Sequence, residues 1–138
     1  MQTLVRLSRL GRGRRHLLAR ATIWLAMASA ALAVLPFRRA IRFGSIPLAN
    51  RRSDDIEDCL WAIETAARRV PWRAMCIEKG LAGQRLLRRS GADARLHYGV
   101  RHHPENGKLE AHVWVTIEGR SVIGGQEAAG FAEVAAYP

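Results

Sequence analysis

Cysteine is scarce in this sequence: only Cys59 and Cys76 occur among its 138 residues. Two cysteines are too few for a disulfide scaffold, and they form no CxxC pair of the kind that binds zinc. We therefore expect both thiols to be reduced, in a cytosolic protein. The length leaves room for one domain, and the 49% share of hydrophobic residues predicts a packed core rather than a disordered or multi-span membrane chain.

Acidic residues are absent from the first 52 positions, although the chain carries 12 of them. The same stretch holds 11 of the 22 Lys and Arg residues, so the formal net charge of +10 belongs to this N-terminal arm. Residues 53–138 are nearly neutral and form the expected folded domain. A basic segment such as residues 1–52 can bind nucleic acid, anionic lipid or an acidic peptide, and charge alone does not distinguish these partners. No nucleic-acid motif is present, and we expect no nucleic-acid partner.

An uninterrupted apolar segment covers residues 21–36 within this arm. Arginines before it and small residues inside it resemble a secretory signal. The segment is, however, shorter than the roughly 20 residues of a spanning helix, and further arginines follow closely. We expect a helix that ends at Pro36 and packs against the domain or a partner, with membrane association or export as alternatives.

Two helices are predicted at the start of the domain. Ser53, Asp54 and Asp55 provide an N-cap and acidic first-turn residues, and apolar residues then recur at helical spacing to about residue 69. Cys59 lies on that apolar stripe and is expected to be a small core residue. Pro71 ends the helix, and a second helix that carries Cys76 is expected from residue 73 or 74 to residue 90.

The remainder of the domain has the two-residue period of strands. Strands are predicted over residues 94–100, 109–117 and 121–123, with a turn-rich connection at residues 102–108 and a tight turn at residues 118–119. Helices followed by hairpin-connected strands indicate an α+β fold: N-terminal helices and then a small antiparallel sheet.

Cys76 and His112 are the residues best placed for catalysis. A cysteine in the first turn of a helix lies near unpaired N–H groups and the positive end of the helix dipole, which stabilise a thiolate and can donate to an oxyanion. A strand would hold His112 rigidly enough to meet such a nucleophile. From the residues alone, His97, His102 and His103 compete for the role of base. We find no cofactor-binding or metal-ligand motif.

Several motifs follow one another between residues 53 and 125. They are Val70-Pro71-Trp72-Arg73, Cys76, Leu86-Leu87-Arg88-Arg89 with Gly91, Gly99-Val100-Arg101, and Ala111-His112-Val113-Trp114-Val115 with Gly119. Together they resemble the lasso peptide biosynthesis B2 family, which corresponds to the C-terminal part of the microcin processing proteins. The apolar helix that ends in Pro36-Phe37-Arg38-Arg39 is also similar to that family.

The resemblance implies a transglutaminase-like, papain-like cysteine protease that removes the leader from a lasso-peptide precursor. Cys76 would be the nucleophile and His112 the base. The implied partners are the precursor peptide, a separate leader-recognition (B1) protein, and an asparagine-synthetase-like cyclase that uses ATP. This chain itself is expected to need no cofactor.

The sequence departs from the family at one position. The family has an Asp as third member of the triad on the strand after the His, and the matching residue here is Gly124. Glu118 in the preceding turn and Glu127 just beyond are the candidate replacements, and without an orienting group activity should fall. Acyl transfer to an amine, a degenerate scaffold and a non-catalytic basic binding module for nucleic acid or membrane are therefore alternatives to the peptidase.

Overall fold

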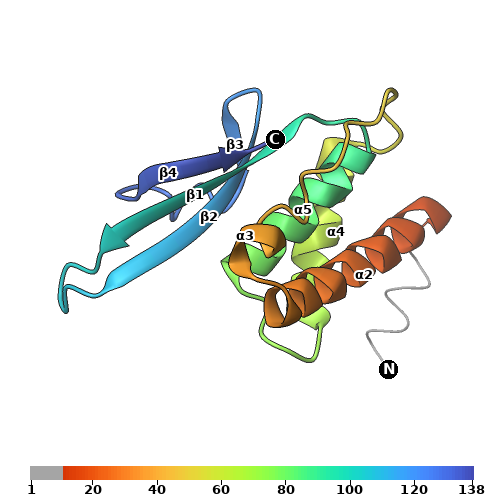
Figure 1. Cartoon of the computed structure of the whole chain (residues 1–138). Coiled ribbons are helices and arrows are strands. Elements are labelled where there is room, and N and C mark those ends of the chain that lie inside the picture. Colours follow the sequence, from red (N-terminus) through yellow and green to blue (C-terminus); the bar gives the residue numbers. More distant parts are fainter. Residues whose placement is uncertain (1–10) are drawn as a thin grey trace.

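The computed structural model describes residues 11–138, and within this range the helices precede the strands. A four-stranded antiparallel sheet lies on one side of α5, and α2 lies on the other side of the helix layer (Figure 1). The sequence-based prediction of an α+β fold is confirmed. The elements are α2 (Arg12–Val34), α3 (Phe37–Ala40), α4 (Ile56–Arg69), α5 (Cys76–Arg89), β1 (Ala94–His102), β2 (Leu109–Ile117), β3 (Arg120–Ile123) and β4 (Ala132–Tyr137).

The first domain helix, α4, has the predicted boundaries. Asp55 is its N-cap, and the Asp55 carboxylate accepts a hydrogen bond of 3.0 Å from the N–H of Glu57. The helix ends at Val70, which has an extended conformation immediately before Pro71. Cys59 is fully buried on the inner face of this helix, as expected.

The second domain helix, α5, begins at Cys76 and not at residue 73 or 74. Its N-cap is Met75, which has an extended backbone and makes no capping hydrogen bond through its side chain. None of the usual capping residues, Ser, Thr, Asp or Asn, precedes Cys76, so the sequence carried no signal for this boundary. The later start makes Cys76 the first residue of the helix.

The sheet has the strand order β3-β2-β1-β4. Glu118 and Gly119 form the tight turn between β2 and β3, with positive φ angles of 51° and 78°. The edge strand β4 was not predicted. It pairs antiparallel with β1, with Leu96 opposite Tyr137.

Helix α2 belongs to the same hydrophobic core as α4 and α5. Its inward residues Leu17, Leu18, Ala21, Leu25 and Ala28 are buried against these two helices. By length and composition α2 is also apolar enough to cross a membrane, although about a third of its apolar window is buried in the fold. The predicted helix thus packs against the domain, and the division of the chain at residue 52 stays a prediction.

Candidate active site

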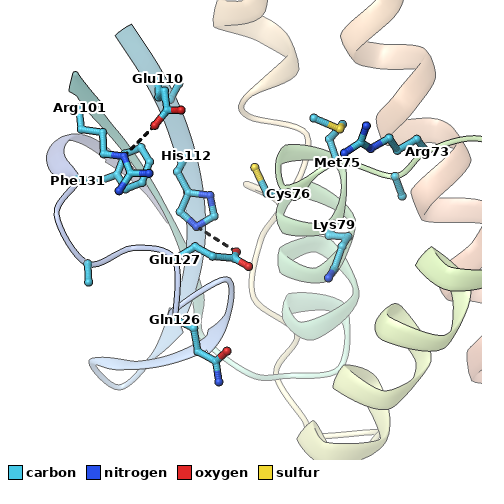
Figure 2. Close-up of a pocket in the computed structure, with 13 residues that line it drawn as sticks. Arg73, Met75, Cys76, Lys79, Arg101, Glu110, His112, Gln126, Glu127 and Phe131 are labelled. Atoms are coloured by element: carbon cyan, nitrogen blue, oxygen red, sulfur yellow. Dashed lines mark hydrogen bonds and ion pairs between the residues drawn. The ribbon is translucent and has the colours of Figure 1, made fainter. Parts of the chain in front are cut away.

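A cavity of about 740 Å³ lies between the start of α5, the first half of β2 and the loop that joins β3 to β4. Cys76 and His112 both line it, from opposite walls (Figure 2). Among the five histidines of the chain, His112 is the one that lines this cavity. The competing bases His97, His102 and His103 lie elsewhere on β1 and the following turn.

Cys76 offers a partly exposed thiol at the head of α5. The first N–H groups of an α-helix have no partner within the helix, and no side chain caps this one. These N–H groups are therefore free to donate to an anion that forms next to the sulfur. Cys59 offers no comparable site, because it is buried and its Sγ contacts the hydroxyl of Ser90 at 3.5 Å.

His112 is held in place by polar and aromatic neighbours. Its side chain is 6% exposed, and its ring packs against Trp114 and Phe131 with centroid separations of 6.1 and 5.3 Å. The Trp114 ring lies over Gly99 of β1, where an added Cβ would be only 2.9 Å from the indole. Gly99 therefore provides the space that this aromatic packing needs.

The hydrogen bond of His112 identifies the tautomer. Nε2 lies 2.9 Å from the carbonyl oxygen of Gly124. A carbonyl can only accept, so Nε2 carries the proton and Nδ1 has the free lone pair. Figure 2 shows Nδ1 on the side of the ring that faces Cys76. The unprotonated nitrogen of the imidazole is thus on the side of the cavity that carries Cys76.

The site lies at the margin of the contact between α5 and the sheet. Val113 and Leu96 point toward α5, since an added Cβ at Gly80 would lie 2.9 and 3.1 Å from their side chains. His112 alternates with Val113 and belongs to the other face of β2. Its ring nevertheless lines the same cavity as Cys76, together with Arg73, Ala74 and Met75, which precede α5.

Gly124, which the resemblance to the lasso B2 family matches to the triad Asp, lies next to His112. A Cβ added at Gly124 would lie 3.2 Å from His112 Nε2 and 3.0 Å from the carbonyl oxygen of Val113. Of the two carboxylates left open by the sequence, Glu127 lines the cavity and its Oε2 lies 3.9 Å from Nε2. Glu118 is in the turn between β2 and β3 and does not line it.

Sequence reasoning assigned no role in the site to two further residues that line the cavity, Arg101 and Phe131. Arg101 forms an ion pair of 2.8 Å with Glu110, and its guanidinium lies 4.4 Å from the centroid of the Phe131 ring. Phe131 precedes the unpredicted strand β4, so nothing in the local pattern placed it beside His112. In residues 11–138 we find no group of three His, Cys, Asp or Glu side chains that could hold a metal ion.

Comparison with known proteins supports the fold described above. A family model described as the transglutaminase-like superfamily matches residues 19–136, which include most of α2 and all of the sheet except Tyr137 at the end of β4. No significant match is found among curated proteins or among solved structures. The superfamily in general includes cysteine peptidases and transferases. The match covers most of the sequence, and the chain therefore belongs to the transglutaminase-like superfamily.

Proposed function

We propose that this chain is a cysteine peptidase that removes the leader peptide from a lasso-peptide precursor. The observation that carries the proposal is the placement of an accessible thiol at a helix start and an imidazole with a free nitrogen in one cavity. The choice of substrate depends on the resemblance of the Cys76 and His112 motifs to the lasso B2 family.

In the first half of the reaction His112 Nδ1 takes the proton of the Cys76 thiol, and the thiolate attacks the carbonyl carbon of the scissile peptide bond. The N–H groups at the start of α5 donate to the resulting oxyanion. His112 then returns the proton to the leaving amine, and the carbon–nitrogen bond breaks. The leader remains attached to Cys76 as a thioester, and the core peptide leaves with a free amino terminus.

In the second half water attacks the thioester, while His112 accepts a proton from the water. The tetrahedral intermediate collapses, the leader leaves with a free carboxylate, and the thiol is restored. Throughout the cycle the carbonyl of Gly124 holds the proton on Nε2, and the carboxylate of Glu127 lies 3.9 Å from the same nitrogen. The carbonyl of Gly124 thus orients the imidazole, which is one of the roles of the Asp in the lasso B2 family.

We further propose the partners that this reaction requires. The precursor would be presented by a separate leader-recognition (B1) protein, and the freed amine would be used by an asparagine-synthetase-like cyclase that consumes ATP. The peptidase itself would use no cofactor and would act in the cytoplasm, where the precursor is made.

Mass spectrometry of a lasso precursor incubated with the full chain and the recognition protein tests this function. We expect hydrolysis at the end of the leader, and loss of this activity in a folded Cys76→Ala variant. Cys59→Ala is the matched control, because Cys59 is buried away from the cavity. An uncut precursor, or a fully active Cys76→Ala variant, would contradict the proposal. A leader coupled to an added amine would instead indicate acyl transfer.

A further inference from the structure

Helix α2 presents an apolar outer face to solvent. Exposed residues recur along it at intervals of three and four, which places them on one side of the helix. The larger ones are well exposed: Ile23 at 55%, Met27 at 46% and Val34 at 79%. In Figure 1 α2 lies at the side of the molecule opposite the sheet. We define the outer face of α2 as Ile23, Ala26, Met27, Ala30, Ala33 and Val34.

The opposite side of α2 is fixed to the domain. Its buried leucines and alanines pack on α4 and α5, and Arg14 and Arg20 form ion pairs of 3.0 and 3.1 Å with Asp58 and Asp54. Insertion of α2 across a bilayer would remove these contacts and open the hydrophobic core. A membrane could therefore reach only the outer face, with the helix parallel to its surface.

Both ends of the outer face are basic. Arg12 and Arg15 are exposed in the first turn of α2, and Arg38 and Arg39 are exposed just after Pro36. Within residues 11–138 none of these four arginines forms an ion pair. No acidic residue occurs in the first 52 positions. The apolar surface is thus bordered by cations that the fold itself leaves uncompensated.

This charge distribution indicates which partner could bind the outer face of α2: a second copy of the chain or an anionic bilayer. In a symmetric pair of chains, the arginines at one end of α2 would meet arginines of the second copy in either relative orientation of the helices. Like charges at such a contact oppose association. An anionic bilayer surface supplies both apolar acyl chains for the outer face and phosphate groups for the arginines.

We propose that the outer face of α2 binds peripherally to an anionic phospholipid bilayer. The apolar residues enter the boundary between headgroups and acyl chains, and Arg12, Arg15, Arg38 and Arg39 contact lipid phosphates. This surface is independent of the proposed peptidase activity, because it includes no residue of the cavity that holds Cys76.

Vesicle cosedimentation of the purified full chain tests the proposal. Vesicles of phosphatidylcholine mixed with phosphatidylglycerol are compared with vesicles of phosphatidylcholine alone. We expect binding to the anionic vesicles only, and a decrease as salt is added. The triple variant Ile23→Gln, Met27→Gln, Val34→Gln keeps helix-forming residues at exposed positions and should lose most of this binding.

Two charge variants test whether vesicle binding depends on the arginines next to the outer face of α2 or on the net positive charge of the whole chain. Arg38→Gln with Arg39→Gln should weaken binding by roughly tenfold or more, on the basis of the usual contribution of a cation near an anionic surface. Arg68→Gln with Arg69→Gln removes the same charge from exposed positions at the end of α4 and should have a smaller effect. Circular dichroism checks that each variant is folded.

Three results would overturn the proposal. One is a folded chain that does not bind anionic vesicles. A second is a triple variant that binds as well as the parent. The third is a dimer, detected by light scattering without lipid, that the triple variant dissociates, since the outer face would then be a contact between two copies. A Cys76→Ala variant should bind vesicles normally, so failure of the peptidase proposal leaves this one standing.

Discussion

The Nε2 atom of His112 lies 2.9 Å from the carbonyl oxygen of Gly124, the residue that the resemblance to the lasso B2 family matches to the triad Asp. The imidazole therefore has a hydrogen-bond acceptor at Nε2, although Gly124 has no side chain to supply one. Glu127 adds a second oxygen at 3.9 Å, on a side chain that is 73% exposed. The carbonyl of Gly124 thus orients the imidazole, and the solvated carboxylate of Glu127 is the nearby negative charge.

Replacement of Glu127 by Gln tests this division. Exposed ion pairs usually contribute about 1 kcal/mol or less, so leader cleavage should fall by about fivefold at most in Glu127→Gln. In an enzyme that relies on the carboxylate to select the tautomer, the corresponding change costs about 10⁴-fold. Single-turnover cleavage rates across a range of pH would measure the effect. A loss of several thousandfold would show that the carbonyl of Gly124 does not suffice.

Gly124→Ala should damage the site more than its backbone strain explains. The φ angle of Gly124 is +70°, so a side chain there costs about 1–2 kcal/mol of stability, and its Cβ would also press on the His112 ring. Gly119→Ala is the matched control, because Gly119 has a φ of +78° and nothing within 4 Å of an added Cβ. Urea unfolding should show a loss of stability in both variants, larger in Gly124→Ala because its Cβ would also lie 3.0 Å from the carbonyl oxygen of Val113, and cleavage assays should show a loss of activity only in Gly124→Ala. Equal activity in the two would contradict the placement of His112.

The thiol of Cys59 predicts a pH dependence of stability. Burial, as the main cause, raises the pKa of Cys59 above its ordinary value of 9.0, and the hydrogen bond with Ser90 offsets this only in part. The folded state therefore favours the neutral thiol. Its contribution to stability is complete below about pH 9.0 and is lost as the pH rises from there toward the pKa of the folded state.

Denaturant unfolding of the parent and of Cys59→Ala at pH values on both sides of 9.0 measures this contribution. The free energy of unfolding should fall more steeply with alkaline pH in the parent, since the variant has no thiol to ionise on unfolding. Parallel curves for the two proteins would show that Cys59 does not contribute.

Gly80 sets the distance between α5 and the sheet. An added Cβ would lie 2.9 Å from Cγ2 of Val113, a branched side chain with little freedom to move. Gly80→Ala should therefore destabilise the protein by about 1–3 kcal/mol, despite the better helix propensity of Ala. Val113→Ala should relieve the contact, so the double variant should lose less than the two single variants combined. Strict additivity in thermal unfolding would contradict this packing.

Local chemistry made much of the fold predictable. The Asp55 cap and Pro71 fix the limits of α4, and the two positive φ angles at Glu118 and Gly119 suit the tight turn read from the sequence. The start of α5 at Cys76 carries no capping residue, so its boundary was placed too early. Strand β4 was not predicted because its sequence, AEVAAY, is rich in alanine and mostly exposed, so it lacks the apolar alternation of a strand. Its pairing with β1 defines it as a strand in the structure.

The side chains of the candidate site were chosen from the sequence, whereas its backbone contacts were not. Cys76 and His112 were chosen from residue type, element and resemblance, and the structure places both on one cavity. The acceptor for Nε2 could not be read from the sequence, because every residue has a carbonyl and only the fold brings that of Gly124 to the ring. Glu118 and Glu127 were both proposed because they are close to Gly124 in the sequence. The fold shows that Glu127 lines the cavity and that Glu118 does not.

The indole of Trp114 stacks with two imidazoles, with its ring centroid 5.5 Å from that of His97 and 6.1 Å from that of His112. The fold thus places an intrinsic fluorophore against the ring of the candidate base, and comparison of the parent with a Trp114→Phe variant would isolate its emission.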